Sequence, residues 1–192
     1  MLLTPVWKNP ACISRLELAP AVWSWLVYSG SFTKKILALK GAEARFNIKI
    51  LGEQLELAKK SSYEFSIFNC HYVYSREIQI FLDDYLLMYA RSVMPQNVAP
   101  FYKRQFRGLG ARPLAEMLFS AFPLQRSPFE IAKIHPMQRE YVLANEANVS
   151  SPRFLWARRS VFSAAQDLLL LTEIFSPSLI ELISNCETPI HK

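Results

Sequence analysis

The chain has 192 residues, of which 51% are hydrophobic and 20% are charged. This length and composition suit one compact domain with a sizeable core and exclude a mainly disordered chain. Lysine and arginine outnumber aspartate and glutamate by 22 to 16, giving a formal net charge of +6. Such a charge suits an anionic partner but does not choose between nucleic acid, a lipid headgroup and a small carboxylate.

The cysteines and histidines are scattered along the chain. They are Cys12, Cys70, Cys186, His71, His135 and His191. An odd number of cysteines without a CxxC pair predicts reduced thiols, as in a cytosolic protein, rather than disulfides. No histidine has a second ligand at a helical or loop spacing, so we expect no metal site.

The amino-terminal stretch MLLTPVWKNP does not resemble a signal peptide. It lacks a basic start and a long apolar run, and Pro5 interrupts it. The most apolar windows of the chain are far shorter than the roughly 20 residues that span a bilayer. The sequence therefore predicts a soluble, cytoplasmic protein that is not an integral membrane protein.

Two short helices are expected near the amino terminus. Residues 21–29 carry an apolar stripe after Pro20, and Gly30 supplies the helix stop. Residues 32–40 predict a second helix with Ser31 as its N-cap. We expect both helices to pack on a sheet.

Alternating apolar residues indicate strands in the next part of the chain. From Arg45 the alternation predicts a half-buried strand that leads to a turn at Gly52 and starts a hairpin. Residues 72–95 contain two strand-like runs separated by the turn signal Asp83-Asp84. We expect these two strands to be antiparallel.

The second half of the chain is less regular. A glycine loop followed by Pro113 predicts a helix over residues 113–122. Residues 123–151 are polar and broken by prolines, which predicts a long excursion with one short helix. Strand character returns over residues 154–176, with a turn near 164–167. Because strands and helices come in blocks rather than in strict alternation, we predict an α+β fold with an antiparallel sheet.

Arg76 and Glu173 are charged residues in strands that look buried. In a strand Arg76 shares its face with Ile78 and Ile80, and Glu173 shares its face with Leu171. An isolated buried charge is costly, so the two could neutralise each other as an ion pair. Alternatively they line a pocket, where Arg76 offers its planar fork to a ligand carboxylate. Glu173 would then face the other end of the ligand, with a pKa that desolvation raises.

Other motifs carry weaker signals. Two basic stretches with aromatic residues, 101–111 and 156–160, could suggest a nucleic-acid surface. Their charges are dispersed and no known binding module surrounds them, so we expect a solvated basic face and no nucleic-acid partner. The GLGARP loop offers helix N-terminal N–H groups to a carboxylate. No GxGxxG, GxxxxGK[ST] or GxSxG pattern is present.

Six motifs in order carry a family resemblance: SGSFTKKI, YSREIQIF, ARSVMP, LGARPLAEMLF, WARRSVF and LLLLTEIFSP. Together they resemble bacterial chorismate lyase, the chorismate pyruvate-lyase that makes 4-hydroxybenzoate for ubiquinone. The resemblance implies a chorismate lyase-like domain over residues 1–177 and a C-terminal extension over residues 178–192. It implies a six-stranded antiparallel sheet whose helices cover an internal cavity for chorismate, without metal or organic cofactor. We expect a monomer.

The resemblance also implies four site residues. Arg76 matches the arginine that binds the aromatic carboxylate, and Glu173 matches the glutamate at the hydroxyl end; we expect both to be catalytic. Leu114 matches a ligand-contacting leucine at a helix start. Phe32 matches an apolar ligand contact that is frequently Met, and Ala115 stands where the family often has Gly. We expect the partner of Arg76 to be a ligand anion rather than a protein group.

Two other functions stay open. The same fold serves as an effector-binding module in some bacterial transcription regulators. That function requires an attached DNA-binding domain, and about 30 residues before the first shared motif leave no room for one. A noncatalytic carrier of aromatic acids would keep Arg76 and tolerate loss of Glu173.

Overall fold

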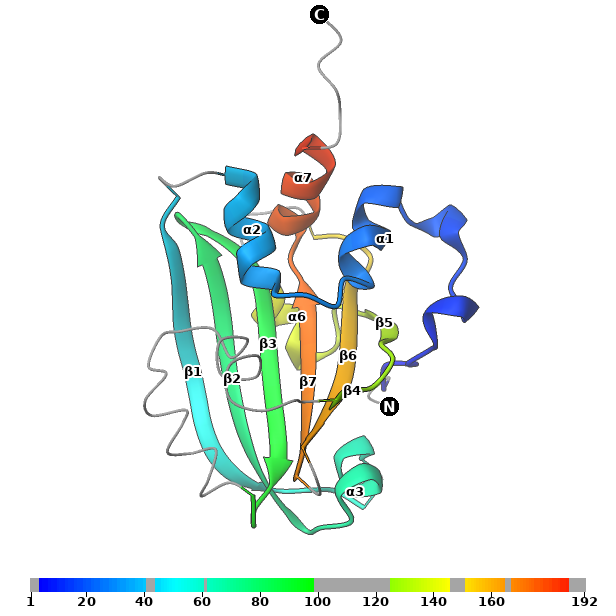
Figure 1. Ribbon diagram of the computed structural model, residues 1–192, viewed down its shortest axis with the longest axis vertical. Helices are drawn as coiled ribbons and strands as arrows, with labels where there is room; N and C mark the ends of the chain where they lie inside the picture. The colour runs from blue at the N-terminus through cyan, green and yellow to red at the C-terminus, as the bar shows by residue number, and fades with distance from the viewer. Residues whose placement is uncertain are drawn as a thin grey trace, which may run out of the picture.

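An antiparallel β-sheet of seven strands forms the centre of the computed structural model, which describes residues 4–40, 44–60, 62–98, 125–145, 151–164 and 167–186. The strand order is β1-β2-β3-β7-β6-β4, and β5 also pairs with β6 (Figure 1). The predicted α+β class with an antiparallel sheet is confirmed, with seven strands in place of six.

The strands are β1 (Phe46–Leu57), β2 (Tyr72–Leu82), β3 (Tyr85–Pro95), β4 (Gln125–Arg126), β5 (Glu130–Ile134), β6 (Leu155–Ala164) and β7 (Asp167–Phe175). The helices are α1 (Pro20–Leu26), α2 (Phe32–Lys40), α3 (Tyr63–Phe68), α6 (Arg139–Ala144) and α7 (Pro177–Cys186). Two 3-10 helices, Pro10–Cys12 and Arg15–Glu17, precede α1.

The two predicted amino-terminal helices are confirmed as α1 and α2. Helix α1 ends at Leu26, four residues before Gly30, so the predicted stop lies in the connection and not at the helix end. Ser31 caps α2 as predicted, because its Oγ accepts a hydrogen bond from the Lys34 N–H at 3.4 Å.

The predicted β2–β3 hairpin is also confirmed, with its turn at Asp83 and Asp84. Asp83 has a φ of 54°, a left-handed conformation that aspartate tolerates better than most residues. Its Oδ1 accepts a hydrogen bond from the Arg45 N–H at 3.0 Å, and its own N–H donates to the Arg45 carbonyl at 2.8 Å. The turn therefore also holds the start of β1.

The predicted turn at Gly52 is wrong. Strand β1 continues to Leu57, and its pairing with β2 shifts register between Ile50 and Gly52. This irregularity inserts one extra residue, as a β-bulge does. Without the shift Gly52 would lie opposite Arg76, but with it Glu53 occupies that place. The predicted pairing of β1 with its successor does occur, through a connection that contains α3.

Helices α1, α2 and α7 pack on one face of the sheet (Figure 1). Their fully buried side chains include Leu26, Ile36 and Leu179, which form one core cluster with Phe175 of β7. Residues 178–192 were predicted to be an extension, and their described part lies in α7, whose Ile183 is also buried in this core. A domain boundary at Pro177 stays a prediction.

Helix α6 packs on the other face of the sheet, where Tyr141 and Ala144 contact the cluster around Tyr89 and Ile174. This helix lies in the segment predicted to be an excursion with one short helix. The same segment also contains β4 and β5, which the sequence did not predict.

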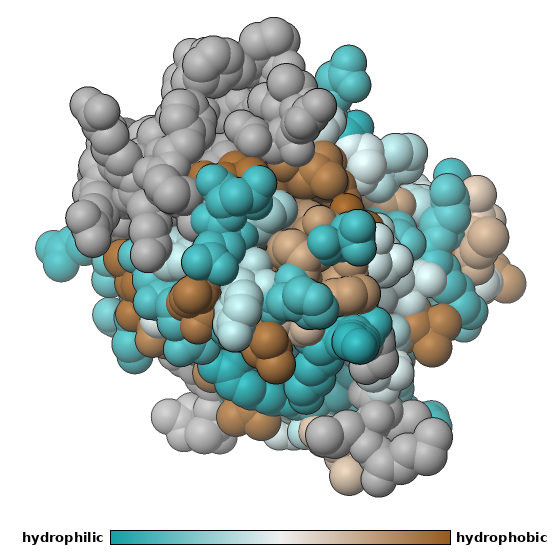
Figure 2. All heavy atoms as spheres, turned by 90° about the horizontal axis from the view of Figure 1, so that it is seen from below, coloured by the Kyte–Doolittle hydropathy of each residue, from teal (hydrophilic) through white to brown (hydrophobic). Residues whose placement is uncertain are grey.

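The end of the molecule that carries α3 has a mixed surface, with brown apolar side chains among teal polar ones (Figure 2). Leu57 and Tyr72, which pair at the margin of the sheet, are more than half and about half exposed. Among the described residues, no helix is both long enough and apolar enough to cross a membrane.

Candidate active site

The strand register places Arg76 and Glu173 on the same face of the sheet. Arg76 of β2 lies opposite Ser92 of β3, and Glu173 of β7 lies opposite Ala90 of β3. Residues that lie opposite each other, or two apart on one strand, share a face. The Cα atoms of Arg76 and Glu173 are about 12 Å apart, because the residues are offset by two strand spacings across the sheet and two residues along it. Both residues are buried, at 1% and 5% exposure.

Small side chains occupy the middle of this face between the two charged residues. Ala90 and Ser92 are both buried, and both come from β3, which lies between β2 and β7. Ile78 lies opposite Ala90 on β2, and Leu171 lies opposite Ser92 on β7, so larger apolar side chains flank these two small ones. An arginine and a glutamate on one face, separated by small side chains, present opposite charges to whatever lies between them.

A protein carboxylate meets Arg76. The Nε of Arg76 donates to Oε1 of Glu53 at 2.8 Å, and the Tyr74 hydroxyl donates to the other oxygen of Glu53 at 3.1 Å. The expectation that the partner of Arg76 is a ligand rather than a protein group is therefore wrong for Nε. The β1 register shift brings Glu53 to this position, and Glu53 itself is partly exposed, at 27%.

The partner of Glu173 is also a protein group, Arg158 of β6. Oε2 of Glu173 accepts from the Arg158 Nε at 2.7 Å, and both side chains are buried. The Arg158 Nη1 also donates to the carbonyl oxygens of Trp25 and Tyr28, at 2.9 and 2.8 Å. Arg76 and Glu173 thus have separate partners, and the interpretation that they neutralise each other as an ion pair is wrong.

Phe32 lies beside this Glu173–Arg158 pair. Its ring centroid is 5.0 Å from the Arg158 guanidinium carbon and 5.3 Å from the Phe175 ring. Trp25 contacts the other side of the Phe32 ring edge-on, with 5.0 Å between the centroids. The structure therefore places Phe32 beside the Glu173–Arg158 pair, with Arg76 further along the same face of the sheet. Leu114 and Ala115, with the helix predicted over residues 113–122, lie outside the described residues.

Sequence reasoning missed Glu53, Arg126 and Arg158. Arg158 belongs to the stretch WARRS, which we expected to be a solvated basic face, yet it is 1% exposed and its neighbour Arg159 is 8% exposed. The signal was present, because Arg158 shares strand parity with Trp156, as Arg76 does with Ile78. The other stretch, residues 101–111, lies outside the described residues.

We call the sheet face that carries Arg76, Arg126 and Arg158 the arginine face. Arg126 of β4 donates through Nε to the Ser160 Oγ at 2.8 Å, and its Nη2 lies 3.7 Å from the Glu173 Oε2. Three arginines here meet two glutamates, Glu53 and Glu173, among the residues that the structure describes. This set has one excess positive charge, which favours an anionic ligand.

The opposite face carries a different ion-pair network, in which arginines do not outnumber glutamates. Its members are Arg91, Arg139, Arg159, Glu56, Glu64, Glu77 and Glu130. Arg139 donates to both oxygens of Glu77 at 2.7 Å, and these hydrogen bonds hold the pKa of Glu77 below its usual value against the opposing effect of burial. Because protein carboxylates already neutralise these arginines, the arginine face is the better candidate for binding an acid.

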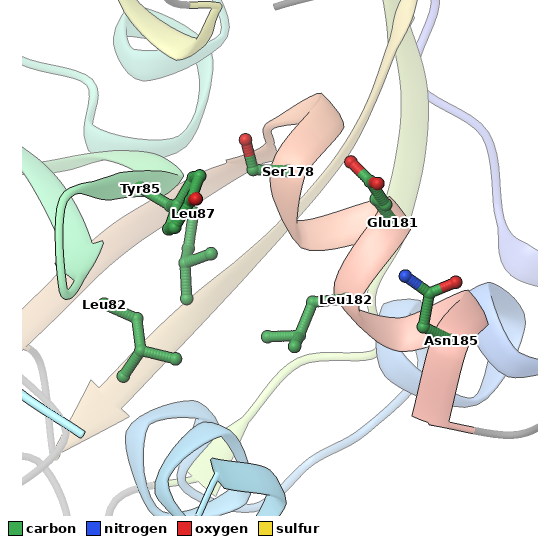
Figure 3. Close-up of a pocket in the computed structure, with 7 residues that line it drawn as sticks. All are labelled: Leu82, Tyr85, Leu87, Ser178, Glu181, Leu182 and Asn185. Carbon is green, nitrogen blue, oxygen red and sulfur yellow. The ribbon is translucent and has the colours of Figure 1, made fainter. Parts of the chain in front are cut away.

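A groove of about 290 Å³ lies between the β2–β3 turn and α7 (Figure 3). Its lining residues are Leu82, Tyr85, Leu87, Ser178, Glu181, Leu182 and Asn185. Figure 3 shows the polar tips of Ser178, Glu181 and Asn185 along α7, and leucine side chains facing them. The only ionic side chain in this lining is Glu181, so the groove lacks a cation for an acid, and we do not place the site there.

Two solved structures resemble this fold. PhnF from Mycobacterium smegmatis superimposes with a TM-score of 0.54 at 15% identity, covering 79% of this chain and 66% of that chain. A GntR-family transcriptional regulator from Bacillus cereus gives a TM-score of 0.52 at 12% identity, covering 71% and 94%. At these identities the likeness shows a shared fold, an α+β domain with an antiparallel sheet.

Sequence comparison shows the family. The profile described as Chorismate lyase matches residues 1–182. A probable chorismate pyruvate-lyase of Shewanella sp. strain MR-4 is 32% identical over 160 residues, covering 83% of this chain and 80% of that protein. A protein of the same name from Shewanella frigidimarina is 30% identical, covering 93% and 91%. The chain belongs to the chorismate lyase family, a family of carbon–oxygen lyase enzymes.

Proposed function

We propose that the protein is a chorismate pyruvate-lyase, which converts chorismate to 4-hydroxybenzoate and pyruvate. Family membership supports this activity, and so do the names of the relatives. The observation that carries the proposal is the position of Arg76 and Glu173 on one buried face, about 12 Å apart between Cα atoms across small residues. We further propose that the enzyme acts as a cytoplasmic monomer in ubiquinone biosynthesis.

Arg76 binds the ring carboxylate in this proposal. Glu53 orients the guanidinium through Nε, and the ligand carboxylate is bound through the Nη side of the planar fork. The para hydroxyl of the ring then points to Glu173, whose Oε2 is fixed by Arg158. Phe32 forms an apolar wall beside that end, and Leu114 supplies a further ligand contact.

The reaction asks mainly for binding, orientation and charge stabilisation. The ether bond between ring C3 and the enolpyruvyl oxygen breaks, and the hydrogen on C4 leaves as a proton. The ring becomes aromatic, and the released enolate of pyruvate takes up a proton. The electrons of the C4–H bond form the new ring double bond, and those of the C3–O bond leave with the oxygen. The reaction is therefore an elimination that needs no oxidant or reductant, and we expect no cofactor. Fixed arginines can stabilise the negative charge that develops on the leaving oxygen.

Incubation of the purified protein with chorismate tests the activity. Pyruvate is measured through lactate dehydrogenase and NADH, and 4-hydroxybenzoate by absorbance after chromatography, each against a reaction without protein. We expect equal molar amounts of both products. Folded protein that forms neither product would reject the lyase function. Binding of 4-hydroxybenzoate without turnover would instead support the alternative, a noncatalytic aromatic-acid-binding or effector-sensing protein.

A further inference from the structure

Arg126 lies beside Glu173 without being the main partner of that carboxylate. Its Nη2 is 3.7 Å from Glu173 Oε2, whereas the Nε of Arg158 is 2.7 Å from the same oxygen. Arg126 also donates hydrogen bonds to the Ser160 Oγ at 2.8 Å and to the Ser29 carbonyl at 3.2 Å. Arg126 is therefore held in place mainly by neutral groups, next to a carboxylate that already has its own arginine.

Among the described residues, Glu173 is the one carboxylate that pairs with Arg126. Burial lowers the pKa of Arg126 to about 10, and the nearby cation of Arg158 acts in the same direction, while Glu173 opposes both. The guanidinium lies 4.0 and 4.7 Å from the ring centroids of Phe129 and Phe162. Arg126 is a buried cation beside aromatic rings, and it shares the Glu173 carboxylate with Arg158. A further anion at this position would therefore be stabilised.

Chorismate has a second carboxylate for which the proposed function does not yet account. It belongs to the enolpyruvyl ether on ring C3, next to the C4 that carries the hydroxyl. A ligand whose ring carboxylate is at Arg76 and whose hydroxyl is at Glu173 therefore holds the ether beside Glu173. Ser160, which fixes Arg126, belongs to the same row of the sheet as Arg76, so Arg126 lies on the side of Glu173 nearer to the ring.

We propose that Arg126 binds the enolpyruvyl carboxylate and so distinguishes substrate from product. This inference rests on the proposed function, because it uses the orientation of chorismate given above. The product 4-hydroxybenzoate has no second carboxylate and makes no contact with Arg126. The charged contact to Arg126 thus supports substrate binding and is lost once the ether bond breaks.

A purely structural role for Arg126 predicts a different result. Arg126 joins the carbonyl of Ser29, in the α1–α2 connection, to Ser160 of β6, so its loss could loosen the site as a whole. Such loosening would weaken the binding of substrate and of product to the same extent. If Arg126 recognises the second carboxylate, its loss weakens the binding of only those ligands that possess one.

The experiment compares two inert ligands by calorimetry. One is 4-hydroxybenzoate, and the other is 3-(carboxymethoxy)-4-hydroxybenzoate, which carries a second carboxylate on an ether at ring position 3. The variants are Arg126→Gln and Arg126→Lys, and the matched control is Arg159→Gln. Arg159 is a buried arginine on the same sheet, but it faces the other side and pairs with Glu130 at 2.8 Å. The KM and kcat of wild type and variants for chorismate complete the set.

We expect Arg126→Gln to lower the affinity for the dicarboxylate at least tenfold, about 1.4 kcal/mol. The affinity for 4-hydroxybenzoate should fall less than twofold. Arg126→Lys should recover part of the loss, and Arg159→Gln should change neither affinity. In turnover, KM for chorismate should rise more than kcat falls. Equal weakening of both ligands, or no weakening of either, in folded Arg126→Gln would overturn the proposal. Failure of the wild-type protein to convert chorismate would overturn the lyase function instead, and the two affinities would still test Arg126.

Discussion

Replacing Arg76 by Met should separate ligand binding from folding. Met keeps the apolar stem of the side chain and removes the guanidinium, which is 1% exposed and hydrogen-bonded to Glu53. Without it a bound carboxylate is buried with no cation, which costs about 2–4 kcal/mol. The affinity for 4-hydroxybenzoate should therefore fall roughly 30- to 700-fold.

The free energy of unfolding should change much less. Glu53, the carboxylate that loses its partner, is 27% exposed and can be hydrated again when Arg76 is absent. We expect a loss of about 1 kcal/mol, the usual net value of one hydrogen bond. For a chain of this size that corresponds to a fall in Tm of roughly 2–4 °C.

Calorimetric titration with 4-hydroxybenzoate measures the affinity, and urea unfolding measures the stability. Arg159→Met is the matched control, because it removes another buried arginine, one that lies on the opposite face. The control should bind 4-hydroxybenzoate like the wild type. Affinity within threefold of the wild type in folded Arg76→Met would refute the placement of the ligand on the arginine face.

Three further predictions concern the ion pairs. Arg158→Met should lower the free energy of unfolding by about 3–5 kcal/mol, because buried Glu173 then keeps only the longer contact with Arg126. In thermal unfolding, Arg158→Met combined with Glu173→Leu should be more stable than Arg158→Met alone. Glu173→Gln should slow the release of pyruvate from chorismate while the far-UV spectrum is kept; wild-type turnover in this variant would remove the catalytic role. Arg139 lowers the folded-state pKa of Glu77, so this pair stabilises the protein above the unfolded value near 4.5, and the stabilisation is lost as pH falls through the lowered pKa. Urea unfolding between pH 7 and pH 3 should therefore be less acid-sensitive in Glu77→Gln, and an identical pH profile would contradict the assignment.

Local patterns in the sequence were sufficient for much of the fold. The hairpin of β2 and β3 follows from alternation and from the turn at Asp83 and Asp84, because both signals are local. Strand parity alone placed Arg76 on a buried face. The same rule placed Glu173 in a buried strand, although it could not say which strands would separate the two.

The missed features depend on pairing between distant segments. A β-bulge near Gly52 leaves no mark on alternation that distinguishes it from a turn, and yet it decides that Glu53 meets Arg76. Strand β4 has only two residues, so it exists only through its pairing with β6, and Arg126 could not be assigned to the sheet from its neighbours. Arg158 was misjudged because a run of two arginines looked solvated, although in a strand that is buried on both faces both residues of such a pair are covered.

The arginines of the arginine face also hold the connection between α1 and α2 through its backbone carbonyls. Arg158 donates to Glu173 and also to the carbonyl oxygens of Trp25, near the end of α1, and of Tyr28, just beyond it. Arg126 holds the next part of this connection through the carbonyl of Ser29. The connection leads directly into α2, whose first residue is Phe32, a proposed ligand contact. Glu173 therefore fixes the α1–α2 connection through its arginines, so its replacement should disturb the wall of the site as well as the chemistry at the hydroxyl end.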